Sequence, residues 1–305
     1  MDRNYFDLKD NVAIVTGCSG GLGVQMAKAL ASQGASIVAV ARRKERIEAV
    51  ANQIAEEFGV PTFAVQCNIK STDAVDAMVD AVIEKFGRID ILINNAGTGA
   101  IGNAEDITDE QFENEMQIDL FGSFRVARAV AMIPAKYGRI INIASMYGLV
   151  GNMVAGSTPY HAAKGGVVNM TRALAAEWGK HGITVNAICP GYFYTDLTTE
   201  TLNSDFFQQH AKVTIPEQRY GDDLLARDRG QDRRHLPGLP RLELRHRRAP
   251  GRRRWLHLHL APSVWRLAAT SQSPTTAFPR ERGDVGRCKR PSRPGATHFG
   301  RLVTS

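Results

Sequence analysis

A glycine-rich turn between a short apolar run and a helical pattern constrains the fold of this chain more than any other feature. The apolar run Val12–Thr16 is typical of a buried strand. It leads into the turn Thr16-Gly-Cys-Ser-Gly-Gly-Leu-Gly23, and the helical pattern Val24–Gln33 follows. A glycine-rich turn alone is often a plain loop. Between a strand and a helix, however, it is typical of the site that binds the pyrophosphate of a dinucleotide.

Three glycines of this turn have expected roles. Gly17 permits the tight turn, Gly21 lets the backbone approach phosphate, and Gly23 lets the helix pack on the sheet. The helix N-terminus adds N–H groups and the positive end of a dipole.

Apolar runs and helical patterns alternate along most of the chain, which predicts an α/β fold with a doubly wound parallel sheet of the Rossmann type flanked by helices in a single domain. Ligands of such sheets bind at the carboxyl ends of the strands. Gly17, Asn94, Ser145 and Gly191 are all expected there. The expected strands are Val12–Thr16, Ser36–Val40, Thr62–Gln66, Ile89–Ile93, Arg139–Ala144 and Ile183–Ile188; the expected helices are Val24–Gln33, Lys44–Phe58, Thr72–Phe86, Thr108–Pro134 and Pro159–Lys180.

Two arginines, Arg42 and Arg43, follow the second strand where an acidic residue would bind the ribose 2′-hydroxyl of NAD. Arginine at this point accommodates the 2′-phosphate of NADP. The pattern therefore favours NADP, with NAD still possible. The alternative is a solvated helix start with no role in binding.

Tyr160 and Lys164 are four residues apart, directly after Pro159. If Pro159 opens a helix, the two side chains lie on one face, one turn apart. An ammonium beside a phenol lowers the pKa of the tyrosine from its usual ~10, which favours proton transfer near neutral pH. Ser145 follows the apolar run before this segment and is expected at a strand end. Taken alone, the Tyr160–Lys164 spacing also fits an ordinary helix face.

The composition disfavours a membrane or secreted protein, and the charge differs between two parts of the chain. No apolar run approaches the ~18 residues of a membrane span, and the polar N-terminus does not resemble a signal peptide. The four cysteines show neither paired nor metal-type spacing, so we expect a cytoplasmic protein without a metal. Residues 1–220 carry a net charge of −5, whereas residues 221–305 carry +12.

These motifs together resemble the classical short-chain dehydrogenase/reductase family over roughly residues 8–221. The matching motifs are Thr-Gly-x3-Gly-x-Gly at 16–23, Asn-Asn-Ala-Gly at 94–97, Ser145, Tyr160-x3-Lys164, and Pro190-Gly191 with Thr195. The resemblance implies that Tyr160 is the general acid/base, that Ser145 hydrogen-bonds the reacting oxygen, and that Lys164 holds the nicotinamide ribose. The cofactor-binding residues that it implies are Gly17, Ser19, Gly21, Leu22, Gly23, Arg42, Arg43, Asn68, Ile69, Asn94, Ala96, Gly97, Tyr160, Lys164, Pro190, Gly191, Phe193 and Thr195.

Two positions depart from the family pattern. Asp119 stands where members usually carry an asparagine that supports a water chain to the lysine, and we retain it as a catalytic candidate. An ionised Asp119 would raise the pKa of Lys164. Asn68 stands where members often carry aspartate, and it can still contact the adenine edge.

Within the family, the segments around Asp119, Ser145, Tyr160 and Tyr192 look most like gluconate 5-dehydrogenase-type enzymes. The resemblance thus implies interconversion of a secondary alcohol and a ketone on a sugar acid or polyol. A 3-oxoacyl-carrier-protein reductase is the alternative. The expected lid, about Asp196–Thr214, has no readable chemistry: Phe206, Phe207 and His210 could line a pocket or pack within an amphipathic helix.

The tail resembles nothing in the family. We divide the chain into a catalytic domain at 1–221 and a basic, Arg/Pro-rich, disordered tail at 222–305. Reading plausible codons for Arg233–Leu260 one base later turns them into a sequence like the family's last helix and strand. We therefore predict a frame slip between about Gly221 and Ala226. The family implies a homotetramer or homodimer, and the altered tail would change the region that builds its interface.

Two other classes of function remain open. One is an NADP(H)-binding protein with impaired turnover, which the intact Ser145, Tyr160 and Lys164 disfavour. The other is nucleic-acid binding through the arginine tail. Such tails usually carry lysine and aromatic residues as well, so we expect a small-molecule substrate and neither nucleic acid nor membrane as partner.

Overall fold

A parallel sheet forms the centre of the computed structural model, which describes residues 7–130, 132–152, 154–196, 198–215 and 220–221. Within this part of the chain the strand order is β3-β2-β1-β4-β5-β6. All the pairings are parallel, and the order reverses between β1 and β4, where doubly wound sheets bind their ligands. The strands are β1 (Val12–Thr16), β2 (Ser36–Ala41), β3 (Thr62–Gln66), β4 (Ile91–Asn94), β5 (Gly138–Ile143) and β6 (Ile183–Ile188).

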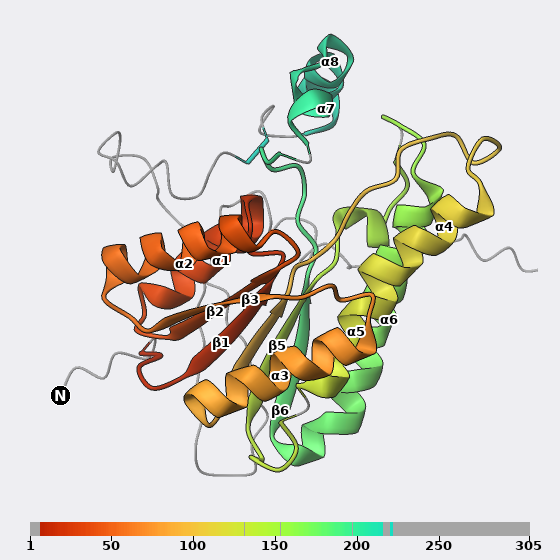
Figure 1. The fold of residues 1–305 in the computed structure, drawn as a ribbon. Helices are drawn as coiled ribbons and strands as arrows, with labels where there is room; N and C mark the ends of the chain where they lie inside the picture. Colours follow the sequence, from red (N-terminus) through yellow and green to blue (C-terminus); the bar gives the residue numbers. More distant parts are fainter. Residues whose placement is uncertain (1–6, 131, 153, 197, 216–219, 222–305) are drawn as a thin grey trace, which may run out of the picture. The chain divides into compact units, whose positions relative to one another are not determined.

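Helices cover both faces of this sheet (Figure 1). One face packs against α1 and α2, and the other packs against α3, α5 and α6. The helices are α1 (Gly21–Ala31), α2 (Lys44–Phe58), α3 (Thr72–Phe86), α4 (Asp109–Met116), α5 (Ser123–Ala129), α6 (Thr158–Trp178), α7 (Thr199–Asn203) and α8 (Asp205–Thr214). The predicted α/β Rossmann-type fold is confirmed.

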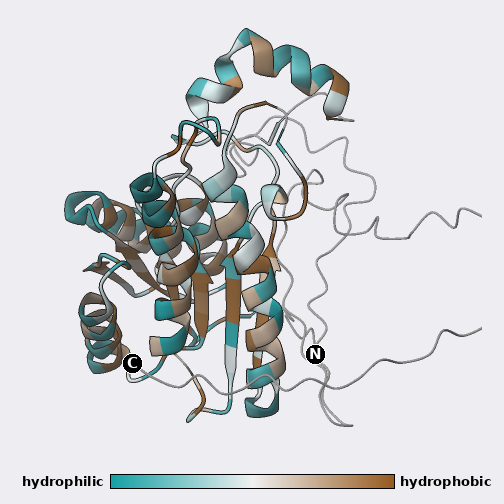
Figure 2. Cartoon of the chain, turned by 90° about the vertical axis from the view of Figure 1, so that its right-hand side faces the viewer, coloured by the Kyte–Doolittle hydropathy of each residue, from teal (hydrophilic) through white to brown (hydrophobic). Residues whose placement is uncertain are grey.

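Alternate side chains of each strand enter opposite cores. In β1, Ile14 packs with the α3, α5 and α6 side, whereas Ala13 and Val15 pack with the α1 and α2 side. All five residues of β1 are buried. Strands covered on both faces need continuous apolar sequence, which is why β1 reads as an apolar run and why several strands of the sheet appear largely brown in Figure 2.

Local signals account for several helix bounds. Ser71 accepts a hydrogen bond from the Ala74 N–H and caps the start of α3. Gly59 and Gly87 end α2 and α3 in the left-handed region, with φ of 68° and 73°.

The helix predicted over Thr108–Pro134 is interrupted. Thr108 and Gln111 form a capping box that starts α4, and α5 ends at Ala129. Between them, Gln117–Gly122 is a π-helix, which no helical periodicity in the sequence revealed. The predicted lid likewise forms two short helices, α7 and α8. Phe207 of α8 is fully buried, whereas Phe206 is 59% exposed and stacks on His210.

Residues 222–305, to which the predicted tail and frame slip refer, lie outside the described residues.

Candidate active site

The glycine turn lies at the carboxyl end of β1 and closes tightly against the end of β4. Gly17 has a φ of 68°, and a Cβ there would lie 2.8 Å from the Cα of Ala96. α1 then begins at Gly21, with no side-chain cap and no acidic residue in its first turn. Its N-terminal N–H groups and dipole are thus well suited to an anion, as the sequence predicted.

Gly23 of α1 lies close to the residues that follow β1 and β4. A Cβ at this position would collide with the carbonyl oxygen of Gly17 and the side chain of Asn95. The close approach of α1 to the residues that follow β1 and β4 therefore requires glycine here.

The end of β4 holds the turn in place through a residue that the sequence reasoning missed. The Asn95 side chain donates to the carbonyl oxygens of Thr16 and Gly17, at 3.0 and 3.3 Å. The neighbouring Asn94 is buried and donates to the Ser123 carbonyl and to Asn142. A signal for Asn95 was present, because it belongs to the same Asn-Asn-Ala-Gly motif.

A cavity of about 510 Å³ runs along the carboxyl edge of the sheet. Its size falls in the range of ligand-binding cavities. Most of the sequence-predicted site residues line it: Gly17, Ser19, Gly21, Leu22, Arg42, Arg43, Asn68, Ile69, Ala96, Gly97, Ser145, Tyr160, Lys164, Pro190, Gly191, Phe193 and Thr195.

Gly23, Asn94 and Asp119 are not among the residues that line this cavity. Gly23 packs against the glycine turn, and Asn94 links β4 to β5. Neither residue faces the cavity directly. The geometry gives these two a supporting position, although the sequence placed them in contact with the cofactor.

Ser145, Tyr160 and Lys164 come together from two elements. Ser145 follows β5, is buried, and its Oγ accepts a hydrogen bond from the Tyr147 N–H at 3.1 Å. Tyr160 lies in the first turn of α6 and Lys164 one turn later, as predicted. The Lys164 Nζ lies 5.5 Å from the centroid of the Tyr160 ring and donates to the Ile143 carbonyl at 3.0 Å.

Asp119 forms a buried ion pair with Lys164. The distance from Nζ to Oδ2 is 2.9 Å, and the other carboxylate oxygen accepts from the Thr98 N–H at 2.8 Å. Burial raises the pKa of Asp119, although the Lys164 ammonium opposes this shift. Burial alone would lower the pKa of Lys164, but Asp119, Tyr160 and the nearby Glu115 outweigh it and raise the pKa. The effect predicted for an ionised Asp119 is thus present.

At the other end of the cavity, Arg42 and Arg43 are exposed. Arg43 donates to Ser19 Oγ at 3.0 Å, which joins the end of β2 to the glycine turn. This places two cations beside the expected position of an adenosine ribose.

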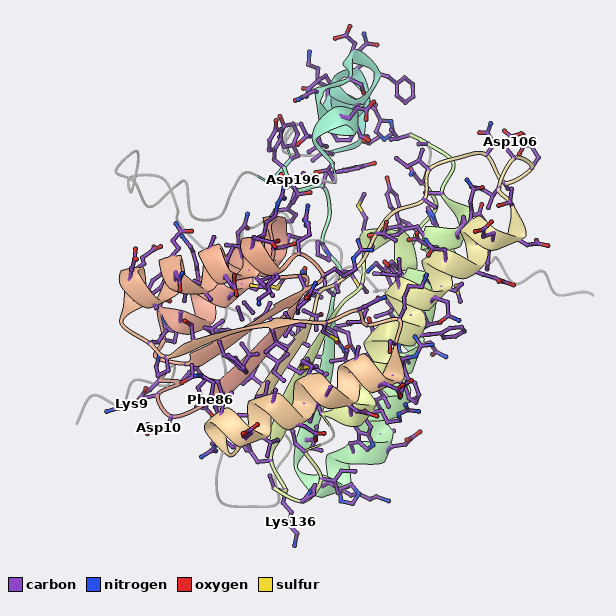
Figure 3. The ribbon with its side chains drawn as sticks, in the orientation of Figure 1. Lys9, Asp10, Phe86, Asp106, Lys136 and Asp196 are labelled. Carbon is purple, nitrogen blue, oxygen red and sulfur yellow. The ribbon has the colours of Figure 1, made fainter. Side chains whose placement is uncertain are left out.

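The segment after β6 lies against the glycine turn. A Cβ on Gly21 would lie 3.2 Å from the Thr195 methyl group. Asp196, labelled in Figure 3, lies 3.6 Å from the Arg46 guanidinium of α2. Thr195 thus lies beside the glycine turn, and Asp196 lies beside α2.

A second polar cluster surrounds the reactive residues in sequence and in space. Tyr147 donates from its hydroxyl to Asn152 at 2.9 Å, contacts the Tyr192 hydroxyl, and stacks on His161 with ring centroids 4.8 Å apart. The buried Nε2 of His161 has no hydrogen-bond partner among the described residues. Burial, together with the Tyr192 hydroxyl, raises the pKa of Tyr147, which therefore stays a neutral phenol.

Metal and membrane features were also sought in the described residues. There, no group of three or more His, Cys, Asp or Glu side chains could hold a metal ion. No helix in that same part of the chain has the length and hydrophobicity to cross a membrane.

Comparison with known proteins agrees with this geometry. The sequence profile of the short chain dehydrogenase family matches residues 11–205. The BbsD subunit of a hydroxy(phenyl)methylsuccinyl-CoA dehydrogenase from Thauera aromatica is 40% identical over 217 residues, which cover 70% of this chain and 85% of that protein. A 3-oxoacyl-acyl-carrier-protein reductase from Staphylococcus aureus is 36% identical over 69% of this chain and 85% of its own length.

A solved structure is also similar, with a TM-score of 0.69 and 32% identity over 72% of this chain and 86% of the other. It is the crystal structure of a gluconate 5-dehydrogenase from Burkholderia cenocepacia in complex with NADP and tartrate. The fold and the site define a dinucleotide-dependent oxidoreductase. This chain belongs to the short-chain dehydrogenase family, and its class is that of the NAD(P)-dependent dehydrogenases and reductases.

Proposed function

We propose that this protein interconverts a secondary alcohol and a ketone on a sugar acid or polyol, with NADP as the cofactor. The observation that carries the proposal is that Ser145, Tyr160 and Lys164 line the same cavity as the glycine turn and the two arginines. Reactive groups and a cofactor cradle are thus continuous along one edge of the sheet. We also propose that residues 1–221 form the catalytic domain.

The glycine turn and the start of α1 fit a dinucleotide for two reasons. Gly17 and Gly21 leave open the space that side chains would fill, and α1 presents an uncapped N-terminus. A bound nicotinamide would supply or accept a hydride. Pro190, Gly191, Phe193 and Thr195 would contact its carboxamide side, since they line the cavity next to Ser145.

Tyr160 acts on the proton in the proposed reaction. Its hydroxyl donates a proton to the ketone oxygen during reduction and accepts it back during alcohol oxidation. Ser145 donates a hydrogen bond to the same oxygen and orients it. Lys164 holds the cofactor ribose and keeps a positive charge beside Tyr160, and Asp119 maintains that charge through the 2.9 Å ion pair.

The arginines favour NADP over NAD. Arg42 and Arg43 line the cavity and no acidic residue follows β2. A 2′-phosphate would be stabilised by these cations, whereas an acid that binds the 2′-hydroxyl is missing. The similar gluconate 5-dehydrogenase structure contains NADP, which supports the same choice here.

The polar cluster favours a hydroxylated substrate. Tyr147 follows Ser145 by two residues and His161 follows Tyr160 directly, so this polar cluster lies next to the reactive residues in the sequence. The similarity to a gluconate 5-dehydrogenase crystallised with tartrate, a hydroxylated acid, supports this class.

A 3-oxoacyl-carrier-protein reductase is the second candidate, and the identity to the Staphylococcus aureus enzyme favours it. A third, an NADP(H)-binding protein with impaired turnover, is disfavoured because Ser145, Tyr160 and Lys164 are all present at the site.

The test is the initial rate of NADPH and NADH oxidation with 5-ketogluconate and with an acetoacetyl thioester. We expect faster turnover with 5-ketogluconate and NADPH. Faster turnover of the thioester would support the reductase instead. NADPH binding without turnover of either ketone would identify a binding protein, and a preference for NADH would contradict the role of Arg42 and Arg43.

A further inference from the structure

Behind the active-site lysine lies an acidic residue that the proposed mechanism does not use. Glu115, in the last turn of α4, is only 1% exposed. Its Oε2 accepts a hydrogen bond from the Ala100 N–H at 3.1 Å, and its Oε1 is buried with no hydrogen-bond partner among the described residues. An ionised carboxylate with an unpartnered buried oxygen lowers the stability of the fold, and protonation of the carboxyl reduces this cost. An unpartnered buried polar group in a native protein therefore calls for an explanation.

Glu115 belongs to one buried charge cluster with Asp119 and Lys164. α4 packs against α6, which carries Lys164, and the two helices lie side by side in Figure 1. Glu115 raises the pKa of Lys164, as Asp119 does. Asp119 pairs with the ammonium directly, and Glu115 is a second buried carboxyl close enough to influence it.

The two carboxyl groups are not equivalent. Asp119 contacts the ammonium directly at 2.9 Å and also accepts from the Thr98 N–H. Glu115 has a single backbone donor. The cluster is neutral when it contains one carboxylate, one ammonium and one carboxylic acid, so the proton belongs on Glu115. Burial, and then the Asp119 charge, raise the pKa of Glu115 to about 7.

Two other titratable groups of the described residues interact with Lys164: Tyr160 on α6 and the Cys189 thiol that follows β6. The segment 98–102 that covers Glu115 contains no ionisable side chain. On α4 itself, Glu113 is exposed, and Asn114 accepts from Lys70 at the surface.

We propose that Glu115 is a positioning residue of the active site: its buried carboxyl, which lies on α4 beside the Lys164–Asp119 ion pair, sets the charge that Lys164 and Tyr160 experience. Loss of the proton adds a negative charge behind the ion pair, and this charge disfavours the phenolate that alcohol oxidation requires. Alcohol oxidation therefore reaches half of its maximal kcat at a higher pH than it would without this charge. This inference rests on the proposed function for its activity readout only.

The test compares the full chain with its Glu115→Gln variant. Glutamine retains an acceptor for the Ala100 N–H but cannot ionise. Glu113→Gln is the matched control, since it removes an exposed carboxylate from the same helix. Two quantities are measured from pH 5 to pH 8: the thermal unfolding midpoint, and kcat for oxidation of gluconate by NADP.

Stability reports on the proton itself. Folded Glu115 retains a proton that the unfolded chain releases from its ordinary value of 4.5, so the wild-type chain loses stability as the pH rises from there to about 7. Glu115→Gln lacks this loss. We expect the difference between its unfolding midpoint and that of the wild type to increase by roughly 5 °C from pH 5 to pH 8. For Glu113→Gln, this difference should not change with pH.

Activity reports on the coupling to the site. In Glu115→Gln we expect the pH of half-maximal kcat to fall by roughly one unit, the size of one charge acting through a partly buried site. A stability difference that does not vary with pH overturns the proposal, and so does an unshifted kcat profile. If the chain turns over neither alcohol nor ketone, the proposed function fails, and the stability comparison still decides whether Glu115 exchanges a proton.

Discussion

The two arginines at the end of β2 have different surroundings from most surface cations. Arg43 is tied to Ser19 of the glycine turn at 3.0 Å, and both Arg42 and Arg43 line the cavity. A surface arginine usually contributes little to stability, so a location beside a binding cavity points to a ligand.

Replacement of Arg43 by alanine should therefore affect one cofactor selectively. We expect the KM for NADPH to rise by roughly 10- to 100-fold, because a charge-assisted hydrogen bond to a phosphate contributes about 1.5–3 kcal/mol. The KM for NADH should change far less. Steady-state kinetics with both cofactors provide the measurement. Arg128→Ala, an exposed arginine of α5 on the opposite face of the sheet, is the control. Equal losses for both cofactors would contradict a 2′-phosphate contact.

Among single residues, those within motifs were predictable and those whose role depends on packing were not. Tyr160 and Lys164 share a helix face by spacing alone, and α6 confirms this. Glu115 reads in the sequence as one of several acids on a polar helix. Its burial results from the segment 98–102, which covers it and which no local pattern predicts.

At the scale of elements, the π-helix Gln117–Gly122 contains Asp119, which forms the ion pair with Lys164. π-Segments inside helices frequently mark functional sites. Gly122 ends this segment, and a Cβ there would lie 2.7 Å from Ile69, a residue that lines the cavity.

Gly122→Ala tests the importance of this close approach. We expect a loss of about 1–3 kcal/mol in the free energy of unfolding, because the methyl group overpacks against Ile69. Denaturant unfolding gives the value, and weaker NADPH binding should accompany it. A Cβ on Gly179 would meet no atom within 4 Å, so Gly179→Ala should be neutral. Equal stability of the two variants would show that the segment tolerates a side chain.

The strands were the most predictable elements and the middle of the chain the least. Strands β1 and β6 match their predicted bounds. β1 is buried throughout, and burial on both faces leaves a continuous apolar run. The predicted helix 108–134 instead divides into α4, the π-helix and α5. A π-helix has about one more residue per turn than an α-helix. The apolar pattern of this segment does not reveal that change, because polar residues at 115 and 119 already interrupt it.

At the scale of the whole molecule, the charge division between residues 1–220 and 221–305 separates the region that matches the family from the tail. We expect the coding DNA to carry a one-base slip between about Gly221 and Ala226, so that the shifted frame encodes a last helix and strand typical of the family. Sequencing the DNA provides the measurement. A clean single frame, with no family-like peptide in the shifted frame, would contradict this expectation.

The central claim is that the chain reduces a ketone through Tyr160, beside the Lys164–Asp119 ion pair. The most direct test is kcat for NADPH-dependent reduction of 5-ketogluconate by the wild-type chain and by its Tyr160→Phe variant. The expected result is turnover by wild type and a loss of at least about 100-fold in kcat in the variant, the contribution of a general acid, with NADPH binding unchanged. Equal turnover by the two proteins would contradict the claim.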